Sequence, residues 1–150
     1  SDVVESYLPG HAESASQFQA MEYGVPYEKL TEAIEIVRES VEGYEMPVPM
    51  YFRRVGEKLY FEFIWLRGFP GGKDYAKKLE ANLIKAFGAD AMPHEGKIYF
   101  QNPWNRVSED TQKDFMAVKA AIDPSNAFLN QYMATYFSGK EDLTDSTTNR

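Results

Sequence analysis

Hydrophobic and polar residues change their spacing several times along this chain, and each change marks the boundary of an expected element. From Gln17 onward the pattern has a period of two until Gly24 and Pro26 end the run, which predicts a strand. Between Tyr27 and Glu42 the apolar residues recur at helical spacing, and charged residues occupy the other face. The chain is therefore expected to begin its fold with a strand followed by an amphipathic helix.

A β-hairpin is expected next. Pro47 and Pro49 flank the start of an extended run that ends at Val55, and a short turn leads into a second run, Leu59 to Leu66. The second run is apolar at almost every position, which indicates that both of its faces are covered.

Two further elements complete the expected sheet. Apolar residues between Asp74 and Phe87 share one helical face, and Gly88 provides the stop. An extended segment follows at Lys97 to Gln101. The order is then strand, helix, strand, strand, helix, strand. This order predicts an α+β fold of the ferredoxin-like βαββαβ sandwich type, with both helices on one face of the sheet.

Two extra helices are expected after the sandwich. Ser108 is a suitable N-cap for the first, which runs to about Ile122, and Asp123-Pro124 breaks the pattern. The second is expected from Ser125 to Phe137. Its three aromatic residues at a spacing of four predict a stripe that faces the core, and they are Phe128, Tyr132 and Tyr136.

The ends of the chain show a different composition. Residues 1–16 mix Gly, Pro, Ser and acidic side chains without a clear period, so we expect a linker or arm there. Residues 138–150 are polar and are expected to form a mobile tail. Residues 17–137 are left as one folded domain, a size that suits a chain of 150 residues.

Composition and charge exclude several classes of function. A formal net charge of −7 argues against broad nucleic-acid binding, which needs Lys and Arg to displace counterions. The chain has no cysteine and only two histidines, so it has no disulfide framework, no thiolate zinc site and no histidine-rich metal site. It contains no apolar run long enough to span a membrane and no signal-peptide pattern, so a soluble chain is expected, with the cytoplasm favoured.

The segment from Pro93 to Lys97 carries the first candidate site residues. Lys97 can stabilise negative charge that develops on an oxygen atom, and His94 can donate or shuttle a proton near neutral pH. The alternative is that His94 caps a strand and Lys97 is an exposed surface charge.

The hairpin carries the second set of candidates. Arg53 and Arg54 point to opposite faces because side chains alternate along a strand. One of them must face inward or into a partner. Glu62 on the facing arm is a natural ion partner for it, and an Arg beside a carboxylate in a pocket can hold a hydroxylated substrate. An ordinary cross-strand pair remains the alternative.

No motif in the sequence completes a catalytic set. The stretch from Gly68 to Gly72 lacks the ending of a phosphate-binding loop and the spacing of a dinucleotide fingerprint. The sequence also lacks a serine-centred elbow and zinc-type histidine spacing.

Three landmarks in a fixed order carry a resemblance to a known family. They are Met21-Glu22-Tyr23-Gly24-Val25-Pro26, then Pro93-His94-Glu95-Gly96-Lys97, then Asp123-Pro124 followed by Phe128-Leu129-Asn130-Gln131-Tyr132. Together they resemble the C-terminal domain of FAD-linked aldonolactone and alditol oxidases. This family includes arabinonolactone, gulonolactone and sugar-alcohol oxidases of the vanillyl-alcohol oxidase superfamily, and the likeness spans roughly residues 17–137.

The resemblance implies that this chain is the substrate-binding cap of a two-domain flavoenzyme. FAD would be bound mainly by another domain or subunit, and a CH–OH group of a sugar lactone or polyol would pass a hydride to the flavin. Lys97 and His94 would be catalytic and face the substrate, His94 and Asn130 would contact the flavin, and Arg53 would bind substrate. The isolated chain is not expected to be active.

Two positions depart from the family pattern. Glu95 stands where the family commonly has Trp, and Tyr51 stands where sugar-alcohol oxidases place a Glu two residues before the Arg. Glu95 is either a replacement base or simply an exposed residue, and Tyr51 and Glu62 become candidate substrate contacts.

Two other functions stay open at this point. The chain could be a stand-alone ferredoxin-like module that binds a small molecule or a partner protein without catalysis. A purely structural interaction domain is favoured only if Lys97 and Arg53 point away from any common concavity.

Overall fold

The computed structural model of the protein describes residues 18–68 and 70–140. The principal elements in chain order are β1 (Phe18–Pro26), α3 (Leu30–Ser40), β2 (Tyr51–Val55), β3 (Lys58–Leu66), α4 (Gly72–Phe87), β4 (Met92–Pro93), α5 (Glu109–Ile122) and α6 (Gln131–Phe137). Short 3-10 turns lie at η1 (Tyr27–Lys29), η2 (Gly88–Asp90) and η3 (Pro103–Arg106). The mixture of antiparallel sheet and helices confirms the α+β class. The expected linker and most of the expected tail lie outside the described residues.

The four strands form one antiparallel sheet in the order β2-β3-β1-β4. Strands β1 and β3 pair along their whole length, from Phe18 opposite Leu66 to Pro26 opposite Lys58. The expected hairpin forms between β2 and β3, and its turn uses the positive φ of 58° at Gly56, which glycine adopts at little cost. This register decides which side chains share a face.

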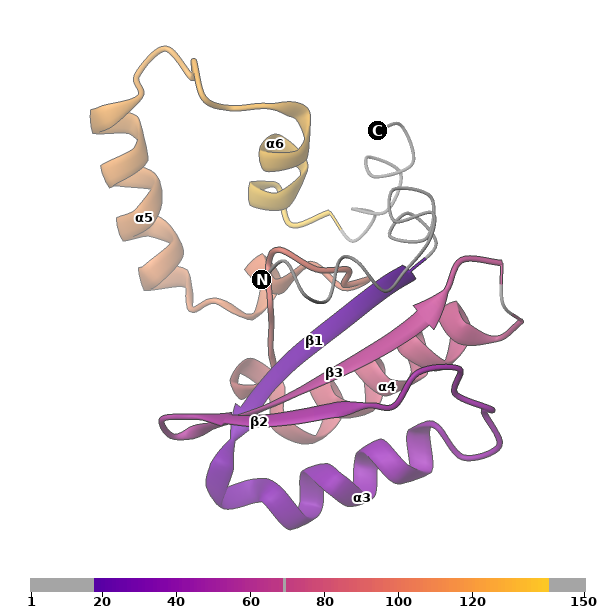
Figure 1. Cartoon of the computed structure of the whole chain (residues 1–150). Helices are drawn as coiled ribbons and strands as arrows, with labels where there is room; N and C mark the ends of the chain where they lie inside the picture. The colour runs from indigo at the N-terminus through magenta and orange to yellow at the C-terminus, as the bar shows by residue number, and fades with distance from the viewer. Residues whose placement is uncertain (1–17, 69, 141–150) are drawn as a thin grey trace, which may run out of the picture.

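Helices α3 and α4 lie on the same face of the sheet, as Figure 1 shows. On this face every second residue of β3 is buried, and β1 and the two helices supply the other side chains of the core. The core residues are Met21, Tyr23, Val25, Ala33, Val37, Leu59, Phe61, Phe63, Trp65, Ala76, Leu79, Leu83, Ala91 and Tyr99. The second face of β3 is only half-buried among the described residues, so the expectation that both faces are covered holds in part.

The last strand lies earlier than predicted. We expected it at Lys97 to Gln101, but β4 comprises Met92–Pro93 and pairs with Tyr23 and Gly24. A turn follows, in which the Lys97 N–H donates to the His94 carbonyl at 2.9 Å. The chain then rejoins β1 through one hydrogen bond, from the Ile98 N–H to the Ala20 carbonyl.

The buried Glu80 of α4 explains why no strand forms after this turn. Its carboxylate accepts the N–H groups of Phe100 and Gln101 at 2.9 to 3.3 Å. It also accepts the Tyr23 hydroxyl at 2.5 Å. These N–H groups are therefore used by a helix side chain and not by a strand ladder.

The last helix begins later than predicted. We expected it from Ser125, but α6 begins at Gln131. Asn126 has a φ of 56°, which is incompatible with a helix, and the Asp123 carboxylate accepts the N–H groups of Ala127 and Phe128 at 2.7 and 3.3 Å. The loop is therefore held by side-chain hydrogen bonds that replace the first helical turns.

The expected aromatic stripe is wrong at one of its three positions. Phe128 lies in the loop and is 85% exposed. Tyr132 and Tyr136 are in α6 and pack against the core.

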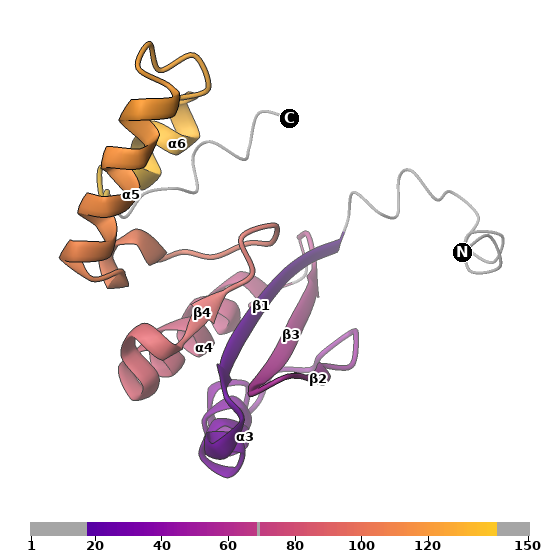
Figure 2. The same cartoon turned by 90° about the vertical axis from the view of Figure 1, so that its left-hand side faces the viewer.

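Helices α5 and α6 lie together, away from α3 and α4, in both views (Figures 1 and 2). Ser108 caps α5 as expected, since its hydroxyl accepts the Thr111 N–H at 3.3 Å. Trp104 joins this pair to the body through ring contacts with Phe115 and Phe137, at centroid distances of 5.6 and 5.0 Å. None of the helices in the described part of the chain is both long and apolar enough to cross a membrane.

Candidate functional site

The face of the sheet opposite α3 and α4 carries two carboxylates at one level. The register of β1 and β3 places Glu22 directly opposite Glu62. Like charges in directly opposite positions of neighbouring strands repel and destabilise a sheet. Cations are therefore needed between or beside them.

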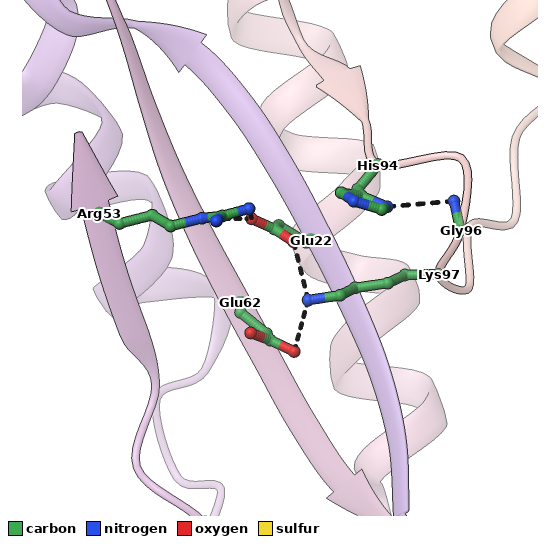
Figure 3. A network of polar contacts seen from close by, with 6 residues as sticks. All are labelled: Glu22, Arg53, Glu62, His94, Gly96 and Lys97. Carbon is green, nitrogen blue, oxygen red and sulfur yellow. Dashed lines mark hydrogen bonds and ion pairs between the residues drawn. The ribbon is translucent and has the colours of Figure 1, made fainter. Parts of the chain in front are cut away.

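Lys97 supplies the first cation. Its Nζ lies 2.7 Å from Glu22 Oε2 and 2.6 Å from Glu62 Oε1, so one ammonium bridges the two carboxylates (Figure 3). The turn after β4 delivers this side chain across β1 to the open face (Figure 3). The bridge offsets the repulsion that the strand register creates.

Arg53 of β2 supplies the second cation. Its Nε and Nη2 both donate to Glu22 Oε1, at 2.9 and 2.6 Å. Each oxygen of the Glu22 carboxylate thus binds a different cation. We call the four side chains Glu22, Arg53, Glu62 and Lys97 the open-face network (Figure 3).

Burial differs sharply within the open-face network. The Glu22 side chain is 1% exposed, whereas those of Lys97, Glu62 and Arg53 are 24%, 27% and 59% exposed. A buried carboxylate is tolerated only when it is paired and hydrogen-bonded. Glu22 meets this condition through its hydrogen bonds with Arg53 and its ion pair with Lys97. Both cations remain partly exposed to solvent.

Opposing effects set the charges of this network. Burial raises the pKa of Glu22, but the hydrogen bonds and charges of Lys97 and Arg53 outweigh it and hold the pKa below its ordinary value of 4.5. Burial lowers the pKa of Lys97, but Glu22 and Glu62 outweigh it and raise the pKa above 10.5. Glu22 and Lys97 are therefore both ionised at neutral pH.

The Tyr60 ring packs closely against the backbone of Gly24 and supports the Arg53 side chain. Gly24, Tyr60 and Arg53 are aligned across β1, β3 and β2, and the Arg53 guanidinium lies 5.4 Å from the centroid of the Tyr60 ring. A Cβ atom at Gly24 would lie 2.7 Å from the Tyr60 ring. The Tyr60 ring can therefore lie here only because residue 24 has no side chain.

His94 lies at the end of β4, beside the open-face network (Figure 3). Its N–H donates to the Glu22 carbonyl at 2.8 Å, and its Nδ1 accepts the Gly96 N–H at 3.1 Å. The residue is exposed. Its backbone is thus fixed to the same Glu22 that binds Arg53 and Lys97.

Glu95 is turned toward α6. The Tyr136 hydroxyl donates to Glu95 Oε1 at 3.2 Å. Burial and the negative charge of Glu95 raise the pKa of Tyr136 to about 12. The neighbouring Tyr132 forms a hydrogen bond with Tyr99, so two tyrosines of α6 hold the segment that contains the turn.

The structure brings three of the predicted site residues into one network, namely Arg53, Glu62 and Lys97. Tyr51 lies opposite Glu62 on β2 and is 55% exposed. Asn130 is the N-cap of α6, where its Oδ1 accepts the Met133 N–H at 2.9 Å. Among the described residues no group of three or more acidic or histidine side chains is placed to hold a metal ion.

The expected ion pair between Glu62 and one of the two hairpin arginines is wrong. The hairpin register places Arg53 opposite Tyr60, and Arg53 reaches past it to Glu22. Glu62 pairs with Lys97 instead. Lys97 and Arg53 therefore point to one carboxylate. A purely structural domain was expected only if the two pointed away from any common concavity.

Glu22 is the residue that sequence reasoning missed. It was noted only as part of a strand and of a landmark. A carboxylate between Met21 and Tyr23, in a strand whose neighbours are buried, was an available signal, because such a charge needs a partner.

A comparison with protein families identifies a relationship over most of the chain. A family model described as D-arabinono-1,4-lactone oxidase matches residues 11–136. The comparison with curated proteins found no match, and neither did the comparison with solved structures.

Proposed function

Because the chain belongs to the D-arabinono-1,4-lactone oxidase family, we propose that it is the substrate-binding cap of an FAD-dependent oxidoreductase. The substrate is a sugar lactone or polyol, and the reaction oxidises one of its CH–OH groups. The observation that carries this proposal is the open-face network, in which Lys97 and Arg53 share one buried carboxylate and stay accessible to solvent.

Lys97 is proposed to stabilise negative charge on the substrate oxygen. An ammonium group has three N–H donors, and that of Lys97 forms ion pairs with two carboxylates, Glu22 and Glu62. One donor is left for a substrate hydroxyl that acquires alkoxide character as its carbon loses a hydride. Arg53 is proposed to hold other hydroxyls of the same molecule, because its guanidinium has donors beyond the two that Glu22 accepts. Tyr51 and Glu62 border this area as further substrate contacts.

FAD supplies a hydride acceptor when it is bound. The sequence has no phosphate-binding loop, so this chain would not hold the cofactor alone. Its own contribution fits the polar edge of a flavin, since the turn after β4 supplies both the Lys97 ammonium and the exposed His94, whose backbone N–H binds the Glu22 carbonyl. His94 is proposed to donate or shuttle a proton there, and His94 and Asn130 are the proposed contacts to the flavin.

The proposed partner is a flavin-binding domain or subunit. Support comes from α5 and the loop after it, where several large apolar side chains are exposed to solvent. Such a patch is rare on a protein surface that contacts no partner. The exposed side chains are those of Phe115, Met116, Val118, Ile122 and Phe128. A mainly apolar hollow between α5 and α6 continues this surface, and its lining also includes Leu129, Met133 and Phe137 together with the charged Lys119 and Asp123.

The proposal is tested in the protein that contains both this chain and the flavin-binding part. Addition of a sugar lactone or polyol should bleach the flavin absorbance. Lys97→Ala should slow flavin reduction at least about tenfold, because one charged stabiliser of the transition state is lost. Lys29→Ala is the matched control, since Lys29 forms an exposed pair with Glu32 beside α3. An unchanged rate in Lys97→Ala would contradict the proposed role, and absence of flavin binding would favour the non-catalytic binding module.

Glu95 enters the proposal as a candidate base. Its contact with Tyr136 offers a second role, which is to hold the turn against α6. Glu95→Gln separates the two, because an amide keeps an acceptor for the hydroxyl but cannot take a proton. A large fall in the rate of flavin reduction would support the role of Glu95 as a base. An unchanged rate would leave Glu95 only the role of holding the turn against α6.

A further inference from the structure

Glu22 contacts three of the proposed site residues. Its carboxylate binds Arg53 and Lys97, and its backbone carbonyl accepts the His94 N–H. We propose that Glu22 is a positioning residue that fixes the Arg53 guanidinium and the Lys97 ammonium at one spacing, so that both act on a single substrate molecule. The identity of the substrate depends on the proposed function, whereas the fixed spacing of the two cations depends only on the contacts of Glu22.

The carboxylate has the geometry for this task. Arg53 binds Oε1 through two nitrogens, and Lys97 binds Oε2 at 2.7 Å. Because the two oxygens belong to one rigid planar group, the positions of the two cations become coupled. Glu62 steadies only Lys97, so it cannot replace Glu22 in this role.

The burial of Glu22 makes it a fixed point. It lies in the middle of β1, and its side chain is 1% exposed. Arg53 and Lys97 have long side chains that lose much rotamer freedom when they are held, and Arg53 is 59% exposed. Without a buried anchor the two cations would sample many arrangements, and a binding group must be held closely to act productively.

A contribution to stability alone does not explain this arrangement. A buried ion pair is weak evidence for stability, because desolvation offsets much of the Coulomb attraction. In this network the buried partner is the anion, whereas the side chains of Arg53 and Lys97 are 59% and 24% exposed. This exposure suits groups that must meet a ligand.

The first test follows the two cations directly by NMR in this chain. Glu22→Gln should move the side-chain nitrogen signals of both Arg53 and Lys97, and should lower the pKa of Lys97 toward 10.5. Glu22→Asp keeps the charge but is one methylene shorter, so it should preserve at most one of the two contacts. Glu35→Gln, which breaks the surface pair with Arg38 on α3, is the matched control and should leave both signals in place. The proposal is overturned if Glu22→Gln leaves either cation unchanged.

A second measurement serves if the Glu22 variants do not fold. In Glu62→Gln the carboxylate that remains beside the two cations is Glu22, with His94 nearby on the turn. Acidification should shift the Arg53 and Lys97 signals with one common midpoint below pH 4.5. Two different midpoints would show that the cations are not held by one group and would overturn the proposal.

Kinetics in the flavin-containing protein separates this proposal from the proposed function. Glu22→Gln should lower the maximal rate of flavin reduction at least about tenfold and also raise KM, because Lys97 and Arg53 are displaced together. If the wild-type protein does not reduce its flavin, the proposed function fails and the NMR result alone decides on Glu22. If the wild type is active and folded Glu22→Gln matches it in both parameters, the positioning role is refuted.

Discussion

Two carboxylates that face each other across β1 and β3 explain most of the chemistry of the open face. Glu22 and Glu62 would repel each other, and Lys97 bridges them. Protonation of Glu22 would weaken its pairing with Lys97 and Arg53, so the free energy of unfolding depends on whether Glu22 is ionised. This linkage makes the stability of the chain depend on pH in a way that can be assigned to single residues.

The pH dependence of Glu22 has a definite sign. Its folded-state pKa is below 4.5, so its stabilising effect is complete above pH 4.5 and is lost as the pH falls through the folded-state pKa. The difference in the free energy of unfolding between the wild type and Glu22→Gln should therefore be constant above about pH 5. It should shrink at lower pH in urea unfolding experiments.

Glu80 provides a control of opposite sign. Burial raises its pKa above 4.5, although the Tyr23 hydroxyl and two backbone N–H groups favour its charged form. The wild type should therefore lose stability relative to Glu80→Gln as the pH rises from 4.5 through the folded-state pKa of Glu80. Two variants with the same trend would contradict this assignment.

Gly24 is a second residue with a specific geometric role. Gly24→Ala should cost about 1–3 kcal/mol, because the new methyl group overlaps the Tyr60 ring and displaces it together with Arg53. Urea unfolding measures the cost. The same substitution in a Tyr60→Ala background should cost clearly less, since the ring that it strikes is gone. An equal cost in both backgrounds would place the strain elsewhere.

Residue type and resemblance predicted Arg53, Lys97 and Glu62 as site residues, and the structure brings the three into one network, but the sequence did not predict their partners. A partner depends on register, and register is a property of the whole strand pair. The register places Arg53 opposite Tyr60, two residues away from Glu62, and Arg53 reaches Glu22 instead. Glu22 was missed for the same reason, because its neighbours on the open face come from segments 31, 40 and 75 residues away.

At the scale of elements, the loop between α5 and α6 shows how a side chain can replace a helical turn. The Asp123 carboxylate accepts the N–H groups of Ala127 and Phe128, and Lys119 lies 3.6 Å from it. Spacing alone predicted a helix from Ser125 because apolar residues recur at helical intervals. The Asp123 carboxylate competes for the N–H groups that a helix would use, and the positive φ of Asn126 turns the chain out of the helical conformation.

Removal of this carboxylate should loosen the loop. Asp123→Ala should cost about 1–2 kcal/mol, the range of a lost cap, and should speed hydrogen exchange at the Ala127 and Phe128 amides. Asp114→Ala on the exposed face of α5 is the matched control and should stay within about 0.5 kcal/mol of the wild type. Unchanged exchange at the two amides would show that the loop is held by other contacts.

The same competition explains the displaced last strand. The segment 97–101 has a central run of residues that favour strands, Ile98-Tyr99-Phe100, but Glu80 accepts the N–H groups of Phe100 and Gln101. Elements whose hydrogen bonds are internal, such as α4 and the hairpin of β2 and β3, were predicted closely. Elements whose hydrogen bonds depend on a distant side chain were not.

At the scale of the whole molecule, one well-packed unit carries a second that is only lightly attached. Neither α5 nor α6 contains a buried residue. They are attached through Trp104, which is 8% exposed and lies 5.6 Å from the ring of Phe115 and 5.0 Å from that of Phe137, and through the contacts of Tyr132 and Tyr136 with the body. Apolar side chains that contact Trp104 therefore attach α5 and α6 to the body, whereas those that face solvent contribute little to the free energy of unfolding.

This difference predicts opposite outcomes for two substitutions. Replacement of both Ile122 and Phe128 by Ser should leave the free energy of unfolding within about 0.5 kcal/mol and should reduce binding of a hydrophobic dye, because these side chains are 77% and 85% exposed. Trp104→Ala should cost about 3–5 kcal/mol, since it removes a buried ring that both helices contact. Urea unfolding and dye fluorescence on the same samples measure both effects. A large loss of stability in the Ser variant would mean that the exposed surface of α5 and its loop supports the fold itself, and it would weaken the case that this surface is kept apolar for a flavin-binding partner.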